Sequence, residues 1–186
     1  MQISIIHTAC LRLEPFAEGH LCEKLVAWLN DPEVVRYSDQ RHRQHTLATS
    51  RAYWESFAGS ANVYWAVIAV GNPETMIGTV TAYVDDNNLV ADVGILLGEK
   101  RCWRGGYGTE AFGAVVNWLV RHRKIRKVTA GTMAENTAML GVMRKAGMRE
   151  EGRRERYYLF EGREVDMVYG TVFAEEWGNC PDGMTR

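Results

Sequence analysis

Several short stretches of the chain alternate hydrophobic and polar residues with a period of two, which is typical of strands with one buried face. The first carries Leu11 and Leu13 on one face and ends at Pro15. The later stretches are separated by turn residues and span residues 64–70, 76–84, 91–97, 127–132, 149–160 and 165–173. Because short turns join 64–70, 76–84 and 91–97, we expect these three to form an antiparallel meander.

Other stretches repeat hydrophobic residues every three or four positions, which predicts helices with one buried face. They span residues 20–29 and 46–57, a segment from a glycine-rich turn to the basic group 121–124, and residues 136–146. Asn30, Asp31 and Pro32 stop the first helix, and Gly147 suits the position after the last. The polar segment 38–45 is interpreted as a flexible surface loop.

This order of elements predicts a single α+β domain. One strand–helix–strand crossover lies in the middle of the chain, between residues 91–97 and 127–132. Such crossovers are nearly always right-handed and join parallel strands. We therefore expect these two strands to be parallel neighbours whose carboxyl ends face the glycine-rich turn.

That turn contains Gly105, Gly106 and Gly108 and is the strongest candidate for chemistry. Glycines let backbone N–H groups approach a ligand closely, and a helix start adds unpaired donors and a partial positive charge. An anion such as phosphate is therefore the expected occupant.

Two known phosphate-binding patterns fit the turn poorly. Gly106, Gly108 and Ala111 satisfy G-x-G-x-x-A, but the charged residues 99–101 separate the glycines from the strand, where a dinucleotide fold needs the turn at the strand end. A P-loop needs Lys followed by Ser or Thr after its last glycine, and here Thr109 and Glu110 follow. A nicotinamide-dependent enzyme, the alternative that the first pattern leaves, would bind NAD tightly.

Composition narrows the class further. The 186 residues carry 22 Lys and Arg against 23 Asp and Glu, so the formal net charge of -1 gives no electrostatic case for nucleic acid or an anionic membrane. The 4 cysteines are widely spaced, and neither they nor His42 and His45 form a metal site by spacing. No signal or membrane-spanning segment is visible, so we expect a cytoplasmic protein.

Three strings, GILLGEKRCWRGGYGTEA, ENTAMLGVMRKAGMREEG and YYLFEGREVDMVYG, together resemble the GNAT superfamily of acyl-CoA N-acetyltransferases. The resemblance is strongest to the branch of ribosomal-protein N-terminal, spermidine and amino-sugar acetyltransferases, and it extends from Leu11 to about Gly170. It implies the GNAT fold, a mixed and mostly antiparallel central sheet flanked by about four helices, over residues 1–176. Residues 177–186 would form a flexible tail.

The resemblance also implies a binding site for acetyl-CoA as co-substrate. Its pyrophosphate would be bound by the turn, formed by Arg104, Gly105, Gly106, Tyr107, Gly108 and Thr109. The family motif Gln/Arg-x-x-Gly-x-Gly/Ala has Trp103 at its first position here, a departure that leaves the backbone donors intact. Strand residues Ile95, Leu96 and Leu97 would accompany the pantetheine and thioester. Asn136 would either contact the pantetheine or serve as a helix N-cap, or both.

Catalytic residues are less determined by the sequence. Asp92 lies where many relatives place an acidic residue that acts through water, although an Asp at a strand start is commonly a surface residue. Many relatives carry a tyrosine acid seven residues after the asparagine, and here that position is Met143, which has no proton to donate. Tyr157, with Tyr107 and Tyr158 as alternatives, is the substitute, and catalysis by positioning alone is the other possibility. Glu110 suits a structural role.

Attack by the amine on acetyl-CoA is expected to be direct, since no cysteine or serine is evidently activated. In relatives the acceptor amine is shaped by the segments that correspond here to Asn30–Thr46 and Arg149–Phe173. Their mixed charges fit a protein N-terminus or small-molecule amine, and an amino sugar or nucleotide-amino-sugar is the alternative. From another class, the chain would be an acyl-CoA sensor without turnover. We expect a monomer or homodimer, without nucleic-acid or membrane partners.

Overall fold

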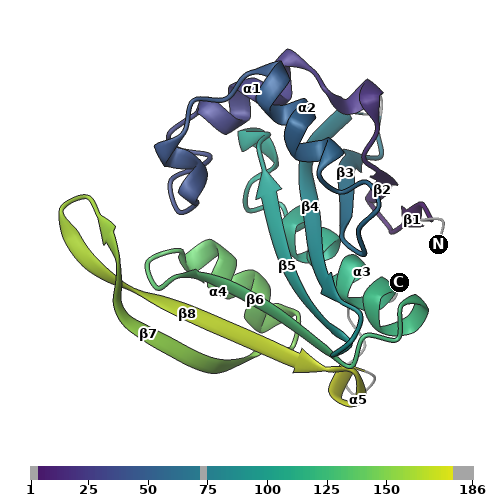
Figure 1. Ribbon diagram of the computed structural model, residues 1–186, viewed down its shortest axis with the longest axis vertical. Helices are drawn as coiled ribbons and strands as arrows, with labels where there is room; N and C mark the ends of the chain where they lie inside the picture. The colour runs from purple at the N-terminus through teal and green to yellow at the C-terminus, as the bar shows by residue number, and fades with distance from the viewer. Residues whose placement is uncertain (1–3, 72–74, 178–186) are drawn as a thin grey trace.

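The computed structural model describes residues 4–71 and 75–177. The described strands form one sheet in the order β1-β2-β3-β4-β5-β6-β8-β7 (Figure 1). Their bounds are β1 Ile6–His7, β2 Leu11–Pro15, β3 Val63–Ala69, β4 Thr75–Asp85, β5 Val90–Leu97, β6 Lys127–Met133, β7 Arg149–Phe160 and β8 Arg163–Phe173. In this part of the chain β5 and β6 are the one parallel pair, and every other neighbouring pair is antiparallel. The predicted meander and the predicted parallel crossover are both confirmed.

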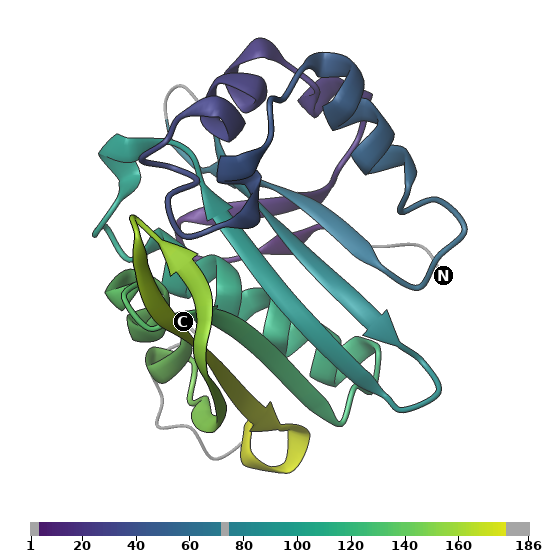
Figure 2. The same cartoon turned by 60° about the vertical axis from the view of Figure 1, so that its left-hand side comes forward.

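Helices cover both faces of the sheet. Helices α1 (Glu23–Asn30) and α2 (Leu47–Glu55) lie on one face, and α3 (Tyr107–His122) and α4 (Thr137–Lys145) on the other (Figures 1 and 2). The alternation along β3 explains this division: Trp65 and Val67 belong to the core under α3, whereas Tyr64 and Ile68 belong to a second core with α1. The expected α+β GNAT fold is confirmed.

The parallel pair β5 and β6 is short. Its register covers Val90↔Lys127, Ala91↔Val128 and Asp92↔Thr129, and then stops. Strand β6 continues to Met133 in register with β8, while β5 continues to Leu97 in register with β4. The two halves of the sheet therefore diverge after Asp92 (Figure 1).

Some predicted boundaries differ from the structure. Helix α1 begins at Glu23 instead of His20, because residues Glu18–His20 form a separate 3₁₀ turn, η1, in which the Ala17 N–H donates to His20 Nδ1 at 2.9 Å. The segment predicted as a flexible loop contains another 3₁₀ turn, η2 (Asp39–His42). Its end is fixed by Asn30, whose side chain exchanges two hydrogen bonds with the His45 backbone.

The chain ends are described only in part. Trp177, the first residue of the expected tail, closes the short helix α5 (Ala174–Trp177) and donates its indole N–H to Asn117 at 3.2 Å. Residues 178–186, which make up the rest of that tail, lie outside the described residues, as does most of the predicted turn at 71–73. Within the described residues, no helix is long and apolar enough to span a membrane.

Candidate functional site

The glycine-rich turn lies between β5 and α3 and has an unusual backbone. A 3₁₀ turn, η3 (Lys100–Cys102), follows β5, and the chain then takes positive φ angles at Arg104 (63°) and Gly106 (87°). Gly106 is the N-cap of α3, so Tyr107, Gly108 and Thr109 form the first turn of the helix instead of a loop. Left-handed conformations are strained for residues with a Cβ, which explains glycine at 106.

The backbone donors of this turn are open. Of the N–H groups from Arg104 to Thr109, that of Gly105 alone has an acceptor within the described residues, the Cys102 carbonyl at 3.4 Å. The first intrahelical bond runs from the Glu110 N–H to the Gly106 carbonyl at 3.0 Å. No side chain from residues 4–71 or 75–177 caps the helix. The turn thus presents free N–H groups and the positive end of a sixteen-residue helix dipole, an arrangement that fits a pyrophosphate.

Neighbouring contacts hold the turn in place. The Trp103 indole N–H donates to the Leu97 carbonyl at 2.8 Å, so the departure from the family motif provides a tether to the end of β5. A Cβ on Gly108 would lie 3.2 Å from Leu97 and 3.6 Å from Val142, so glycine here lets α3 start close to β5 and α4. Glu110 accepts hydrogen bonds from the Thr8 hydroxyl at 2.6 Å and the Cys10 N–H at 2.7 Å. These contacts join α3 to the N-terminal segment.

The strand before the turn has one backbone edge without a partner strand. Beyond Asp92, no strand in the described part of the chain pairs with the β6-facing edge of β5. Ile95 and Leu97 pack against the core under α3, and Leu96, by the alternation of the strand, points to the face covered by α1 and α2. A pantetheine arm, which carries amide groups, fits an edge with free backbone donors and acceptors.

Asn136 serves as the N-cap of α4. Its Oδ1 accepts from the Met139 N–H at 3.1 Å, and its Nδ2 donates to the Thr132 hydroxyl at 2.9 Å. The helix-capping prediction is confirmed. The side chain also ties α4 to β6, which leaves one amide hydrogen and one lone pair of Oδ1 for a ligand.

Asp92 lies at the point where β5 and β6 separate. Its carboxylate accepts a hydrogen bond from the Thr129 hydroxyl at 2.7 Å. The side chain reaches the surface, but surrounding protein removes part of its hydration and raises the pKa of Asp92, while the Thr129 hydrogen bond opposes the rise. A carboxylate with a raised pKa is a better proton acceptor than an ordinary surface aspartate.

Tyr83 on β4 is paired with Asp92 on β5. Its hydroxyl lies 2.6 Å from that of Tyr53 on α2, and burial raises the pKa of Tyr53, so Tyr53 stays protonated. Sequence reasoning identified neither the tyrosine pair nor Thr129. Alternation along β4 places Tyr83 on the α2 face, but the contact depends on how α2 packs.

The other candidate catalytic residue, Tyr157, is far from Asp92. It lies near the tip of the β7–β8 hairpin, 51% exposed, with its ring against Tyr158. Along β6, Met133 is four residues, or about 13 Å, from Thr129, the hydrogen-bond partner of Asp92. Met133 pairs with Met167 on β8, and Tyr157 on β7 lies beyond Met167, still closer to the hairpin tip. The fold therefore does not bring Asp92 and Tyr157 together. Met143, at the position of the family tyrosine, is 4% exposed in the core.

The far end of the divergence is bridged by side chains from α1–α2 and from the hairpin. Arg36 pairs with Glu161 at 2.9 Å, and the rings of Tyr37 and Phe160 lie 5.4 Å apart. Tyr37 joins a small core formed by Met133, Phe160 and Val165. The two segments that the resemblance assigned to the acceptor amine thus touch each other.

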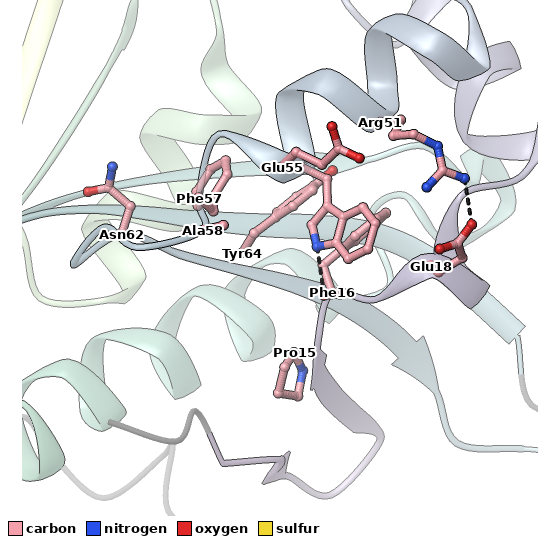
Figure 3. Close-up of a pocket in the computed structure, with 10 residues that line it drawn as sticks. Pro15, Phe16, Glu18, Arg51, Glu55, Phe57, Ala58, Asn62 and Tyr64 are labelled. Atoms are coloured by element: carbon pink, nitrogen blue, oxygen red, sulfur yellow. Dashed lines mark hydrogen bonds and ion pairs between the residues drawn. The ribbon is translucent and has the colours of Figure 1, made fainter.

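A separate hollow of about 410 Å³ lies between β2, β3 and α2 (Figure 3). Aromatic side chains line it, and Arg51 and Glu18 form an ion pair of 2.5 Å at its rim. It contains none of the residues predicted for the site. The described residues also contain no group of three His, Cys, Asp or Glu side chains placed to hold a metal ion.

Comparison with known proteins agrees with this geometry. Solved structures with the same fold include a GNAT-family acetyltransferase from Bacillus anthracis (22% identity, TM-score 0.78, covering 92% of this chain and 99% of that one). A second is a ribosomal L7/L12 alpha-N-protein acetyltransferase in complex with coenzyme A (16% identity, TM-score 0.81, covering 91% of this chain and 98% of that one). A third is the spermidine N-acetyltransferase of Vibrio cholerae in complex with CoA and spermine (14% identity, TM-score 0.80, covering 92% of this chain and 99% of that one). The model of the acetyltransferase (GNAT) domain family matches residues 11–149. With open backbone donors at the start of α3 and a sheet that diverges at Asp92, the chain belongs to the GNAT family and is an acetyl-CoA-dependent acetyltransferase.

Proposed function

We propose that the protein transfers the acetyl group of acetyl-CoA to a primary amine by direct attack in a ternary complex. The observation that carries this proposal is the position of Asp92, where β5 and β6 part, hydrogen-bonded to Thr129. Both substrates would meet on the unpaired edge of β5.

The backbone of Arg104–Thr109 would bind the pyrophosphate of CoA. Its free N–H groups supply the donors, and Arg104, which is exposed beside them, adds a charge-assisted contact. The unpaired edge from Val93 to Leu97 would bind the pantetheine amides. A backbone N–H of that edge would also stabilise the oxyanion that develops when the thioester is attacked.

Asp92 would act as the general base. An alkylamine has a pKa of about 10.4 and is mostly protonated at neutral pH, so it must lose a proton before it attacks. The raised pKa of Asp92 makes its carboxylate a better acceptor for that proton, directly or through water. Thr129 would orient the carboxylate.

A dedicated acid for the CoA thiolate is not required by this proposal. Met143 is buried in the core and has no proton to donate. Tyr157 stays a prediction: its ring is in contact with Tyr158 and with the Arg154 guanidinium, both on the β7–β8 hairpin. A thiolate is a good enough leaving group to depart before protonation.

The candidate acceptors within this reaction are a protein N-terminus or small-molecule amine, with an amino sugar or nucleotide-amino-sugar as the alternative. Of the related proteins, one acetylates a ribosomal protein and another spermidine, which supports a broad range of amines for this fold. The contact between the α1–α2 segment and the β7–β8 hairpin favours a small acceptor, because Arg36–Glu161 and Tyr37–Phe160 occupy space that a long peptide would need.

The test is release of free CoA thiol when acetyl-CoA is mixed with a panel of amines: peptides with free N-termini, glucosamine derivatives and spermidine. We expect amine-dependent release with at least one of them, and loss of that release in Asp92→Asn. Acetyl-CoA binding without thiol release on any amine would instead favour the sensor. The result would be checked by titrating acetyl-CoA calorimetrically, which measures binding independently of turnover.

A further inference from the structure

The β7–β8 hairpin carries five arginines, and their charges are neutralised unequally. Four have carboxylate partners: Arg149 with Glu176, Arg153 with Glu150 and Asp166, Arg156 with Glu164, and Arg163 with Glu135. Arg154 has no carboxylate within reach in the described part of the chain. A cation left without a counter-ion among so many acids is the feature of this hairpin that the fold does not explain.

Arg154 is held by two tyrosines. Its guanidinium carbon lies 5.1 Å from the ring centre of Tyr157 and 5.2 Å from that of Tyr169. Both distances are within the range of cation–π attraction, which positions a guanidinium without neutralising its charge. The planar donor fork therefore stays available for an anion.

The Arg154 side chain lies on the face of the sheet that α1 and α2 cover, the face to which Asp92 also points. Tyr169 is opposite Gly131 on β6, and its ring lies 3.2 Å from the position of a Cβ there. Gly131 alternates with Ala130, which packs under α3, so the ring and the guanidinium above it are on the opposite face, the face of α1 and α2. Asp92 and Leu96 point to that same face.

Arg154 is also about as far along the hairpin as Ile95, one of the residues expected beside the pantetheine and thioester, is along β5. It pairs with Met167, and Met167 pairs with Met133, four residues beyond Thr129 on β6. Ile95 is three residues beyond Asp92 on β5. At about 3.3 Å per residue, the two positions have advanced by similar distances, about 13 Å and 10 Å, along the two diverging strands. Arg154 itself is on β7, two strands beyond β6, and its guanidinium, beside Tyr169 on β8, leans toward the opening.

A second arginine approaches the hairpin from the segment between α1 and α2. Arg41, on η2, has a side chain only 14% exposed, and its guanidinium lies 5.8 Å from the ring centre of Tyr158. It donates to the Ser38 carbonyl at 2.8 Å, and Asp39 is a distant partner at 3.5 Å. Asp39 lies beside Arg41, and Asp92 accepts from Thr129 at the start of the divergence, so in the described part of the chain neither acid is an ion-pair partner of Arg154.

We propose that Arg154 binds an oxyanion, a carboxylate or phosphate, on the acceptor, so that the preferred substrate is a small amine that also carries a negative group. This inference rests on the proposed acetyl transfer and specifies its substrate class. Arg41 adds positive potential from the segment between α1 and α2. A polyamine has no group for Arg154 and meets two cations instead, which disfavours it.

Matched pairs of acceptors test this inference: glucosamine 6-phosphate against glucosamine, and the peptide amide Ala-Asp-Ala against Ala-Asn-Ala. The first pair reports a phosphate and the second a carboxylate. We expect the anionic member of at least one pair to have the higher kcat/KM, and spermidine to have a low one. If amines are acetylated but neither anionic member is preferred, the inference is wrong while the acetyl transfer stands. If no amine releases thiol, the proposed function itself fails.

The variant Arg154→Gln separates recognition from structure. Loss of a charge-assisted bidentate contact is expected to raise KM for the preferred anionic acceptor by about tenfold or more, with KM for its neutral partner and for acetyl-CoA unchanged. Arg154→Lys should recover only part of the loss, because an ammonium lacks the planar fork. Arg156→Gln, on the same hairpin but paired with Glu164, is the matched control and should leave the anion preference intact. Equal effects of Arg154→Gln on both members of the pair would overturn the assignment.

Discussion

Asp92 and Thr129 are the last residues paired between β5 and β6, and the Thr129 hydroxyl donates to the Asp92 carboxylate at 2.7 Å. One hydrogen bond thus spans the point at which the sheet divides. It positions the proposed base beside the edge of β5 that has no partner strand. The contact also limits how far the pKa of Asp92 rises, because it favours the charged carboxylate.

Asp92→Asn is expected to lower kcat by about 10²-fold or more, the usual contribution of a general base. KM for acetyl-CoA should change little, because the glycine-rich turn is distant from this residue. The wild-type rate should increase as pH rises through the raised pKa of Asp92, and the variant should lack this acidic limb. A pH profile of kcat/KM measures both effects. An unaltered acidic limb in the variant would exclude Asp92 as the base.

The same pKa shift affects stability. Because the folded-state pKa of Asp92 is above its unfolded value, the folded protein holds this proton more tightly. Its contribution to stability therefore decreases as pH rises from the unfolded pKa, about 3.9, through the folded one. Asp92→Asn, which has no charge to desolvate, should gain stability relative to wild type between about pH 4 and neutral pH. Urea unfolding at both pH values checks the sign; a relative loss on raising the pH would contradict it.

Thr129→Val removes the hydroxyl and keeps the shape of the side chain. Without this donor the pKa of Asp92 should rise further, so the acidic limb of the activity profile should move to higher pH. The effect should vanish in the Asp92→Asn background, because Thr129 is expected to act through Asp92. A double-mutant cycle on kcat tests this coupling. Additive losses would show that Thr129 acts independently.

Gly106→Val should abolish acetyl-CoA binding, measured by calorimetric titration. A Cβ there meets nothing within 4 Å, so the cost comes from the positive φ of 87° and from the bulk placed among the free N–H groups. Gly59→Val is the matched control, since Gly59 also has a positive φ, 72°, and open space, but lies after α2. Both variants should lose about 1–2 kcal/mol of stability. Retained affinity in Gly106→Val would refute the assignment of the turn.

Gly98→Ala should destabilise the fold by about 1–3 kcal/mol, the usual cost of overpacking. Gly98 follows β5 directly, and a Cβ there would collide with the ring of Trp28, a residue of α1 that is 7% exposed. Gly141→Ala in α4 is the control, because a Cβ there meets nothing within 4 Å and alanine stabilises a helix by about 0.5–1 kcal/mol. Thermal or urea unfolding of the two variants should therefore give shifts of opposite sign.

Local patterns predicted most elements well. Period-two alternation identified the strands, and the helical periodicity from Ala111 to Val120 identified α3, because these signals depend on one buried face per element. The start of α1 was harder to predict, since the turn η1 depends on the contact between Ala17 and His20. The ordered segment around η2 depends on Asn30, which reaches across to His45, a contact that no local pattern contains.

The sequence by itself determined the family, the strand order around the crossover and the backbone chemistry of the glycine-rich turn. These properties are local: a glycine at 106 permits its left-handed backbone, and a helix start always leaves N–H groups free. Only the tertiary structure decided which side chains meet. It placed Thr129 on Asp92, separated Asp92 from Tyr157 and buried Met143. It also left Arg154 between two tyrosines with no carboxylate partner among the described residues. Such contacts join residues far apart in the chain, and they depend on register and on where the sheet divides.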